Sequence, residues 1–326
     1  MQFQTKILLL SFIASVVISI IVIPILKRLK VGQIERKEGP ESHLKKQGTP
    51  TMGGIIMIIV IIALTAFCYY DYKTDNQLDV AKNLLPLAFV TIGFGIVGFI
   101  DDFKKLVLKN TKGLSPKAKM VGLLIISVGY TLILTQVLNI GTDIQIPFAN
   151  IYVTFPIWIY IPFAIFVMLG TTNAVNLTDG IDGLATSVTT IIMTTLTIIS
   201  VIFGVKEVTI FGSIIIGTCL AFLLFNLHPA KVMMGDTGSL MLGGAIAGIA
   251  LYLKMPLLLI IIAIIPIIET LSVMLQVAHF KRTGNRIFKM APIHHHFELS
   301  GWKENKIVSV FSLITLVCCI VGLFAI

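Results

Sequence analysis

Long apolar runs separated by short polar stretches dominate the sequence. A helix that crosses a bilayer needs about 20 mostly apolar residues. By that criterion the pattern predicts ten membrane-spanning helices, at 7–26, 52–70, 84–100, 120–138, 155–174, 184–204, 208–226, 239–253, 256–279 and 307–326. The eighth is short and rich in glycine. We therefore expect an all-α polytopic membrane protein that forms a single domain over residues 1–326.

The distribution of Lys and Arg predicts how these helices are oriented. Of the 25 Lys and Arg residues, 20 fall in one set of loops and 5 in the opposite set. Because cytoplasmic loops carry an excess of Lys and Arg, we expect the first set to face the cytoplasm and both termini to face out. A surface this basic would attract anionic lipids and solutes. Topogenesis alone explains the same excess.

Composition agrees with a membrane location. The chain is 56% hydrophobic and 13% charged, with a mean hydropathy of +0.97, which is too apolar for a soluble domain of 326 residues. The four cysteines lie in apolar runs or at their ends. They are therefore expected to be small buried hydrophobic residues rather than a disulfide framework.

Half of the six histidines form one triplet, His294–His296, in a hydrophilic stretch between two apolar runs. Imidazole can bind a metal, titrate near neutral pH or hold a phosphate. The triplet is followed by the carboxylate of Glu298 within two residues. This combination indicates chemistry at a membrane surface.

Asp101 and Asp102 directly follow the third predicted span. Two adjacent carboxylates next to hydrocarbon are costly. A bound divalent cation or a role in proton abstraction would explain them. A solvated helix end neutralised by Lys104 and Lys105 would explain them as well.

Two further turns combine aspartate with glycine. The segment Asn176–Gly183 places Asp179 and Asp182 three residues apart, each before a glycine, without the repeating oxygen ligands of a calcium loop. These acids could hold a nucleoside or a metal, or form a polar turn. In the segment 234–239, Asp236 could ligate Mg²⁺ or simply cap the next helix, whose start could bind phosphate.

A glycine-rich segment, Gly48–Gly54, follows a basic loop and could meet a diphosphate. It lacks the Gly-Lys-Ser/Thr ending of a P-loop. A helix start with small residues for packing is an equal explanation. Glu269 lies within a predicted span, where an acid marks a functional site unless it bonds a neighbouring helix.

Taken together and in this order, the motifs resemble the polyprenyl-phosphate N-acetylhexosamine-1-phosphate transferase superfamily over the whole chain. The segment Pro292–Glu298, with its histidine triplet, is similar to the branch that acts on muramoyl substrates. The resemblance implies Mg²⁺-dependent transfer of phospho-MurNAc-pentapeptide from UDP-MurNAc-pentapeptide to undecaprenyl phosphate, giving lipid I and UMP. It also implies a bacterial cytoplasmic (inner) membrane location and no nucleic-acid partner. Glycine-rich spans would allow a homodimer.

The resemblance also implies roles for individual residues. Asp236 corresponds to the Mg²⁺ ligand, and Asp101 or Asp102 to the residue that deprotonates or positions the lipid phosphate. His294 is expected to contact phosphate, with His295 and His296 supporting it. Lys105 and Lys117 could hold diphosphate or the lipid head. The positions that match the family's nucleoside and inhibitor pocket are Lys46, Thr51, Asn176, Asp179, Gly180, Ile181, Asp182, Asn226 and Gln276.

One departure and several alternatives stay open at this point. Met233 stands where some relatives place an aromatic residue that can stack on uracil. A sister transferase that moves GlcNAc-1-phosphate to the same lipid is the nearest rival function, and a secondary transporter is a rival from another class. Both direct attack by the lipid phosphate and a two-step path through an aspartyl phosphate fit these acids; direct attack is favoured.

Overall fold

The computed structural model describes residues 2–29, 48–106, 108, 113–149 and 151–326. In this part of the chain, nine helices are long and apolar enough to cross a membrane, which confirms the predicted fold class. They are α1 (Phe3–Arg28), α3 (Gly54–Thr74), α4 (Leu78–Leu106), α5 (Pro116–Leu132, continued by the π-helical turn η1, Ile133–Val137), α6 (Ile157–Thr178), α7 (Leu184–Ile202), α8 (Lys206–Asn226), α11 (Ile264–Thr283) and α13 (Glu304–Leu323).

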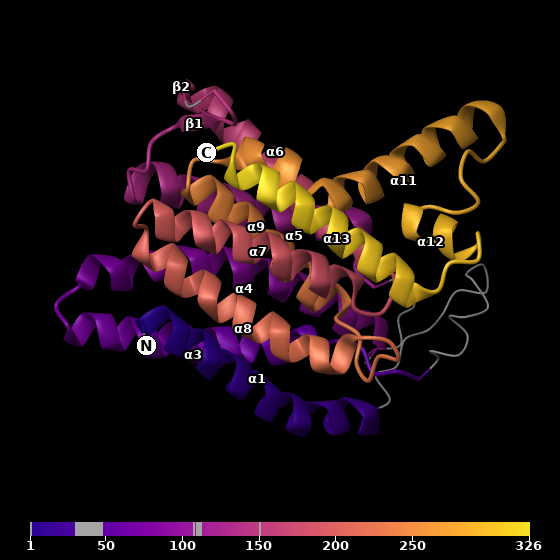
Figure 1. Cartoon of the computed structure of the whole chain (residues 1–326), viewed down its shortest axis with the longest axis horizontal. Coiled ribbons are helices and arrows are strands. Elements are labelled where there is room, and N and C mark those ends of the chain that lie inside the picture. The colour runs from indigo at the N-terminus through magenta and orange to yellow at the C-terminus, as the bar shows by residue number, and fades with distance from the viewer. Residues whose placement is uncertain (1, 30–47, 107, 109–112, 150) are drawn as a thin grey trace.

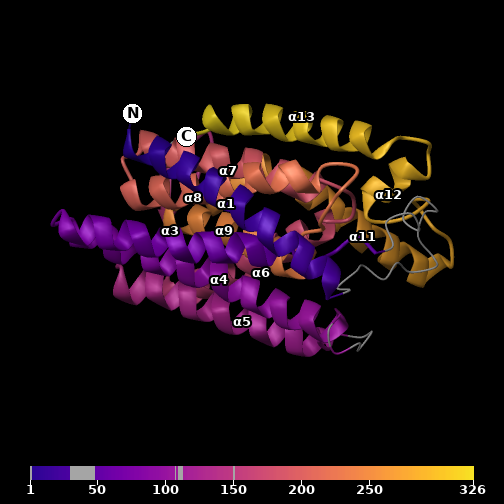
Figure 2. The same cartoon turned by 90° about the horizontal axis from the view of Figure 1, so that it is seen from below.

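The helices form an elongated bundle whose two termini lie at the same end (Figures 1 and 2). The short helix α12 (Ile293–Glu298), which carries the histidine triplet, lies at the opposite end. The count of ten spans and the outward placement of the termini remain predictions.

The eighth predicted span is α9 (Gly235–Tyr252), and it is the central helix of the bundle. Every residue from Thr237 to Tyr252 is buried, and α9 packs against α3, α4, α6 and α7. Its neighbours approach very closely: a Cβ atom on Gly98 would lie 2.1 Å from the Asp236 carbonyl oxygen, and one on Gly54 would lie 2.2 Å from the Gly238 nitrogen. Because protein rather than lipid surrounds α9, small residues suit it better than large apolar ones.

The ninth predicted span, 256–279, is broken in the structure. The turn η2 (Pro256–Leu258) and the short helix α10 (Leu259–Ile262) come first, and α11 starts after Ala263. Pro266 explains the break, because its ring cannot accommodate the carbonyl of residue 262 in a continuous helix and it has no N–H to donate. As a result α11 leaves the bundle at an angle and projects away from it (Figure 1).

A two-stranded antiparallel hairpin, β1 (Asp143–Ile146) and β2 (Ile151–Thr154), precedes α6. Asp143 pairs with Thr154 and Ile146 with Ile151. The hairpin lies at the end of the bundle that holds the termini (Figure 1). It was not predicted from the sequence, and it stands at the end opposite α12.

Candidate active site

Residues from several of the predicted motifs converge at one end of the bundle. The last turns of α4 supply Asp101, Asp102 and Lys105, and the first turn of α9 supplies Asp236. The start of α5 supplies Lys119. We call these five residues the aspartate centre.

Two lysines bridge two of the aspartates in this centre. Lys105 Nζ lies 2.7 Å from Asp101 Oδ2 and 2.9 Å from Asp236 Oδ2. Lys119 Nζ lies 3.1 Å from Asp236 Oδ2 and 3.7 Å from Asp101 Oδ2. Asp101 is only 2% exposed. Burying a carboxylate is costly unless opposite charge lies beside it, and the two ammonium groups place such charge next to Asp101.

Asp102 has a different environment from its neighbour. Its Oδ1 accepts a hydrogen bond from the backbone N–H of Asp236 at 3.2 Å. Its Oδ2 accepts bonds from the Thr237 N–H at 2.8 Å and from the Thr237 hydroxyl at 2.6 Å. Asp102 therefore satisfies N–H groups at the first turn of α9, which have no partner within their own helix. This contact joins α4 to α9 and sets the position of Asp236.

The end of α6 completes the surroundings of Asp236. Asn176 Nδ2 donates to Asp236 Oδ1 at 2.8 Å and to Ser239 Oγ at the same distance. The next acid, Asp179, is the C-cap of α6. Burial raises the pKa of the Asp179 carboxyl well above its usual value, and the charges of Asp236 and Asp102 raise it further. This environment favours the neutral form of the Asp179 carboxyl over the charged form.

The aspartate centre has the donor set that a divalent cation requires. Oxygens of Asp101 and Asp236 approach a single ammonium group to within 3 Å, so they converge on one positively charged position. Carboxylate oxygens of this kind are the ligands that Mg²⁺ prefers, with water and phosphate oxygens completing the shell. The residues therefore fit a Mg²⁺ ion, although the identity of the metal rests on the family resemblance.

The three histidines of the triplet make different contacts. His294 is fully buried, and its Nδ1 lies 3.1 Å from Oε2 of Glu269 on α11. On its other side the ring rests against Gly180, where an added Cβ atom would lie 2.1 Å from His294 Nε2. This Nε2 has no hydrogen-bond partner among the described residues. The triplet thus brings one imidazole beside the Asp179 turn.

The other two histidines hold the segment together. His295 Nδ1 lies 2.6 Å from Glu298 Oε2 on the next turn. His296 Nδ1 accepts a hydrogen bond from the Lys289 N–H at 3.1 Å, and its ring packs edge-on against Phe288. We call α11, the loop 284–292 and α12 together the histidine arm.

Comparison with known proteins decides the family. The model of glycosyl transferase family 4 matches residues 84–254, which include all three aspartates of the centre. Proteins named phospho-N-acetylmuramoyl-pentapeptide-transferase are similar over nearly the full length. The Acetivibrio thermocellus protein is 49% identical over 319 residues, covering 97% of this chain and 93% of the relative. The Clostridium perfringens strain 13 protein is 53% identical over 315 residues (97% and 96%), and the Halalkalibacterium halodurans protein is 46% identical over 317 residues (97% and 95%).

The chain belongs to the phospho-N-acetylmuramoyl-pentapeptide-transferase family. The glycosyl transferase family 4 match ends at residue 254, before the histidine arm. The transferase relatives cover 97% of the chain and extend the likeness beyond that point.

Within the transferase site, sequence reasoning missed Lys119. The lysines expected to assist were Lys105, which contacts Asp101 and Asp236, and Lys117, which is exposed on α5. Lys119 is the α5 lysine that reaches Asp236. The helical spacing of α5 could have indicated Lys119. Leu123, Ser127 and Tyr130 mark the buried face of this helix, and residue 119 lies on the same face.

Two more residues of the transferase fold, His228 and Glu304, were missed around Asp182. Asp182 Oδ2 lies 2.9 Å from His228 Nδ1 and accepts from the Ala230 N–H at 3.1 Å. The Asp182 N–H donates to Glu304 Oε2 at 3.3 Å. The ligand atoms of Asp182, His228 and Glu304 lie within 4.8 Å of one another. At these distances the three side chains contact one another and the backbone directly. They therefore connect the Asp179 turn to the 227–231 loop and to α13.

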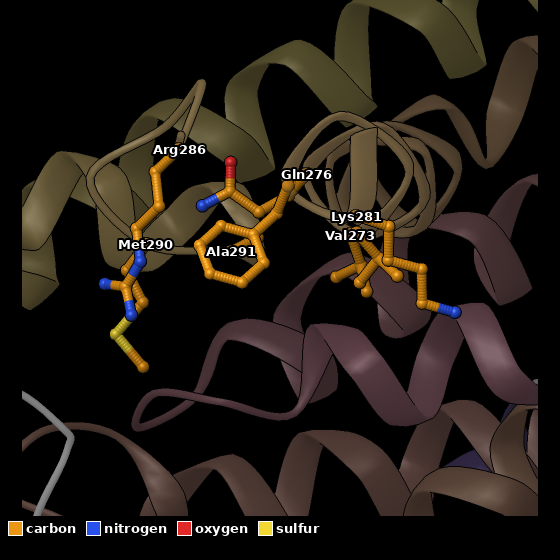
Figure 3. A pocket seen from close by; sticks show the side chains of 8 residues that line it. Val273, Gln276, Lys281, Arg286, Met290 and Ala291 are labelled. Carbon is orange, nitrogen blue, oxygen red and sulfur yellow. The ribbon is translucent and has the colours of Figure 1, made fainter. Parts of the chain in front are cut away.

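Of the remaining predicted pocket residues, Gln276 lies on α11 (Figure 3), and its side chain bonds to the backbone of Ile287 and Phe288. Asn226 is buried, accepts from the Thr186 hydroxyl at 2.7 Å and donates to the Val232 carbonyl at 3.0 Å. Met233 is buried, and its backbone bonds to Pro50 and Gly53. Thr51 and Ile181 are also buried. Lys46 lies outside the described residues.

Proposed function

We propose that this chain transfers phospho-MurNAc-pentapeptide from UDP-MurNAc-pentapeptide to undecaprenyl phosphate, with release of lipid I and UMP. The relatives' common name supports this reaction. The observation in this chain that supports it most directly is the convergence of Asp101 and Asp236 on the two ammonium groups of Lys105 and Lys119. We further propose that the reaction takes place on the inner face of the bacterial cytoplasmic membrane.

Charge neutralisation and positioning are what this reaction demands. An oxygen of the lipid phosphate forms a new bond to the phosphorus that carries the sugar, and the bond from that phosphorus to the UMP oxygen breaks. One diphosphate linkage replaces another, so no net charge has to be created. Phosphoryl transfer of this kind is accelerated mainly by fixed positive charge around the phosphates. Lys105 and Lys119 provide such charge.

Asp236 is proposed to hold the Mg²⁺ ion. When bound, the ion would neutralise phosphate charge and polarise the diphosphate. In that arrangement Lys105 and Lys119 are free to turn from the aspartates to phosphate oxygens. His294 offers an uncommitted Nε2 in the same region, beside Gly180. We assign it to a phosphate of the nucleotide substrate.

The two neighbouring aspartates receive separate roles in this proposal. Asp101, which contacts both lysines, positions the lipid phosphate and accepts its proton. Asp102 has both oxygens occupied by donors of α9 and serves to fix the helix. Because Asp102 is occupied in this way, direct attack by the lipid phosphate is preferred to a path through an Asp102 aspartyl phosphate.

The rival functions are weakened by different observations. A secondary transporter places polar groups and broken helices near the middle of the membrane. Here the functional motifs gather at one end of the bundle. A GlcNAc-1-phosphate transferase would share the aspartate centre, but the histidine arm and the relatives' common name argue against it. That alternative is decided by the choice of nucleotide sugar.

The first test is UMP release by the detergent-purified protein. It would be given UDP-MurNAc-pentapeptide, undecaprenyl phosphate and Mg²⁺, and parallel reactions would contain EDTA or the Asp236→Ala variant. We expect release that requires lipid and metal and falls by about 10²- to 10³-fold in the variant, the scale expected for loss of a transition-state charge contact. Release with UDP-GlcNAc and none with the muramoyl substrate would reject this function in favour of the sister reaction.

A further inference from the structure

The hairpin of β1 and β2 lies at the end of the bundle that holds the termini, and the reaction gives it no role (Figure 1). Its first strand is held against the bundle. Ile144 and Gln145 are each 2% exposed, and the Gln145 N–H donates to the Lys254 carbonyl at 2.8 Å. Lys254 Nζ also lies 2.9 Å from Asp143 Oδ2. These contacts fix the hairpin in one position.

The second strand, β2, is exposed along its whole length. All four of its residues are exposed, although successive side chains of a strand point to opposite faces. Neither face of β2 is therefore covered by the part of the chain that the structure describes. The two faces differ, because Ile151 and Val153 share one and Tyr152 and Thr154 the other. A fixed strand with one apolar and one amphipathic face indicates a binding partner.

The charge pattern indicates the chemistry of this partner. No Asp, Glu, Lys, Arg or His occurs from residue 144 to residue 178. Other connections at the same end of the bundle are charged: α3 ends beside Lys73 and Asp75, and α8 begins with Lys206 and Glu207. Charge suits a loop in water, whereas a charged side chain next to hydrocarbon is costly. The hairpin therefore has the composition of a segment that contacts lipid.

The length of α6 places the hairpin at the boundary of the bilayer. α6 has 22 residues, so at 1.5 Å per residue it is about 33 Å long. The hydrocarbon core of a bilayer is about 30 Å thick. Because the last turns of α6 carry Asn176 of the site, its first turn falls at the opposite boundary. Trp158 in that turn is 73% exposed, as expected for an aromatic residue at a membrane surface.

The backbone of β2 limits how deep the hairpin can lie. Its sheet has two strands, so one edge of β2 faces away from β1. Such an open edge does not occur within hydrocarbon, because no water is present there to hydrogen-bond its N–H and C=O groups. The headgroup layer offers water to the edge and acyl chains to apolar side chains. This layer therefore fits the hairpin better than either the hydrocarbon core or bulk water.

We propose that the hairpin binds the interfacial layer of the leaflet opposite the reaction site. Ile151 and Val153 lie among the acyl chains, and Tyr152 and the open edge of β2 lie among the headgroups. Phe148, which is 64% exposed in the turn between the strands, adds to the apolar contact. The hairpin thereby anchors the start of α6 in the bilayer. This role goes beyond the proposed reaction and does not depend on it.

The test measures the depth of single tryptophans in the full-length protein, reconstituted in phosphatidylcholine bilayers. Trp158 and Trp302 are the only two tryptophans, and both would be replaced by Phe. The probes in β2 are Ile151→Trp, Tyr152→Trp and Val153→Trp. Asp75→Trp is the matched control, because residue 75 is exposed in a charged connection at the same end.

Fluorescence of each probe would be recorded in ordinary lipid, in lipid brominated on its acyl chains, and with acrylamide in the water. Circular dichroism and thermal unfolding identify the variants that fold like their parent. Two probes on the apolar face allow the test to stand if one substitution disturbs the strand.

We expect the probes at 151 and 153 to lose roughly half of their fluorescence in brominated lipid, because their rings would lie about 5–10 Å into the headgroup and acyl boundary. The probe at 152 should respond to both quenchers, and the probe at 75 to acrylamide alone. Quenching of all four probes by acrylamide alone would place the hairpin in water and overturn the proposal. Protection of 151 and 153 from both quenchers would also overturn it, because a protein such as a second copy of the chain would then cover β2.

Discussion

The aspartate centre and the histidine arm share one end of the molecule but are built in opposite ways. The centre is made where α4, α5, α6 and α9 pack tightly, and its aspartates Asp101 and Asp102 are 2% and 4% exposed. The arm depends on α11, which projects from the bundle and exposes Leu271, Met274 and Leu275. One region is embedded in the central helices, whereas the other is attached at the edge.

This difference in construction corresponds to a difference in task. Charges that act on a reacting phosphate must be held within a fraction of an ångström, which requires rigid neighbours on every side. Groups that recognise the remote part of a substrate can tolerate more movement, because they contribute binding energy rather than alignment. We therefore expect substitutions in the centre to reduce kcat and substitutions in the arm to raise KM.

The largest effect should separate the two neighbouring aspartates. Asp101→Asn should lower kcat by roughly 10³-fold with little loss of stability, because a general base or positioning carboxylate is removed. Asp102→Asn weakens the capping of α9, so it should lower the free energy of unfolding by about 1 kcal/mol and the activity by about tenfold. Thermal unfolding in detergent and steady-state kinetics would measure both. A 10³-fold loss for Asp102→Asn at unchanged stability would reverse the assignment.

The second prediction compares two lysines on α5. Lys119→Ala should reduce kcat by about 10²-fold, because it removes one of the two positive charges beside Asp236. Lys117→Ala, two residues earlier on the exposed face, should stay within twofold of wild type. The measurement is kcat at saturating concentrations of both substrates. Similar losses for both variants would show that the long-range charge of the surface matters more than the contact with Asp236.

The third prediction concerns the point where the arm meets the centre. An Ala at position 180 would place its Cβ atom 2.1 Å from His294 Nε2 and must displace the imidazole. Gly180→Ala should therefore cost about 10²-fold in kcat/KM, as small displacements at a reaction site do. Gly170→Ala is the matched control in α6, because nothing lies within 4 Å of its added Cβ atom. Equal activity of the two variants would remove His294 from the reaction.

The helices and the gathering of motifs at one end could be predicted because apolar length and polar interruptions are local properties of the sequence. Which charged residues pair with one another could not be predicted. Lys119 resembles the many lysines that orient loops, and only its place on the buried face of α5 distinguishes it. Glu304 lies more than 120 residues from Asp182, so no local pattern joins them.

The errors in the fold have equally local causes. The span 256–279 was predicted as continuous because its hydrophobicity is continuous, whereas Pro266 ends helix α10 at Ile262. The hairpin of β1 and β2 was missed because each strand has only four residues. The roles of Asp101 and Asp102 could not be separated from sequence, because adjacent identical residues differ only in what folds against them.

The smallest effect is expected for Gln276, and it tests the comparison most sharply. Gln276→Leu removes the three hydrogen bonds that hold residues 287 and 288 against α11. Each such bond contributes about 1 kcal/mol, but water can replace them at this exposed loop. KM for UDP-MurNAc-pentapeptide should therefore rise about fivefold while kcat stays within twofold. Gln276→Glu, which keeps the acceptor for both N–H groups, should lose less. If kcat fell as far as in Lys119→Ala, the arm would belong to the catalytic machinery and the division between chemistry and recognition would not hold.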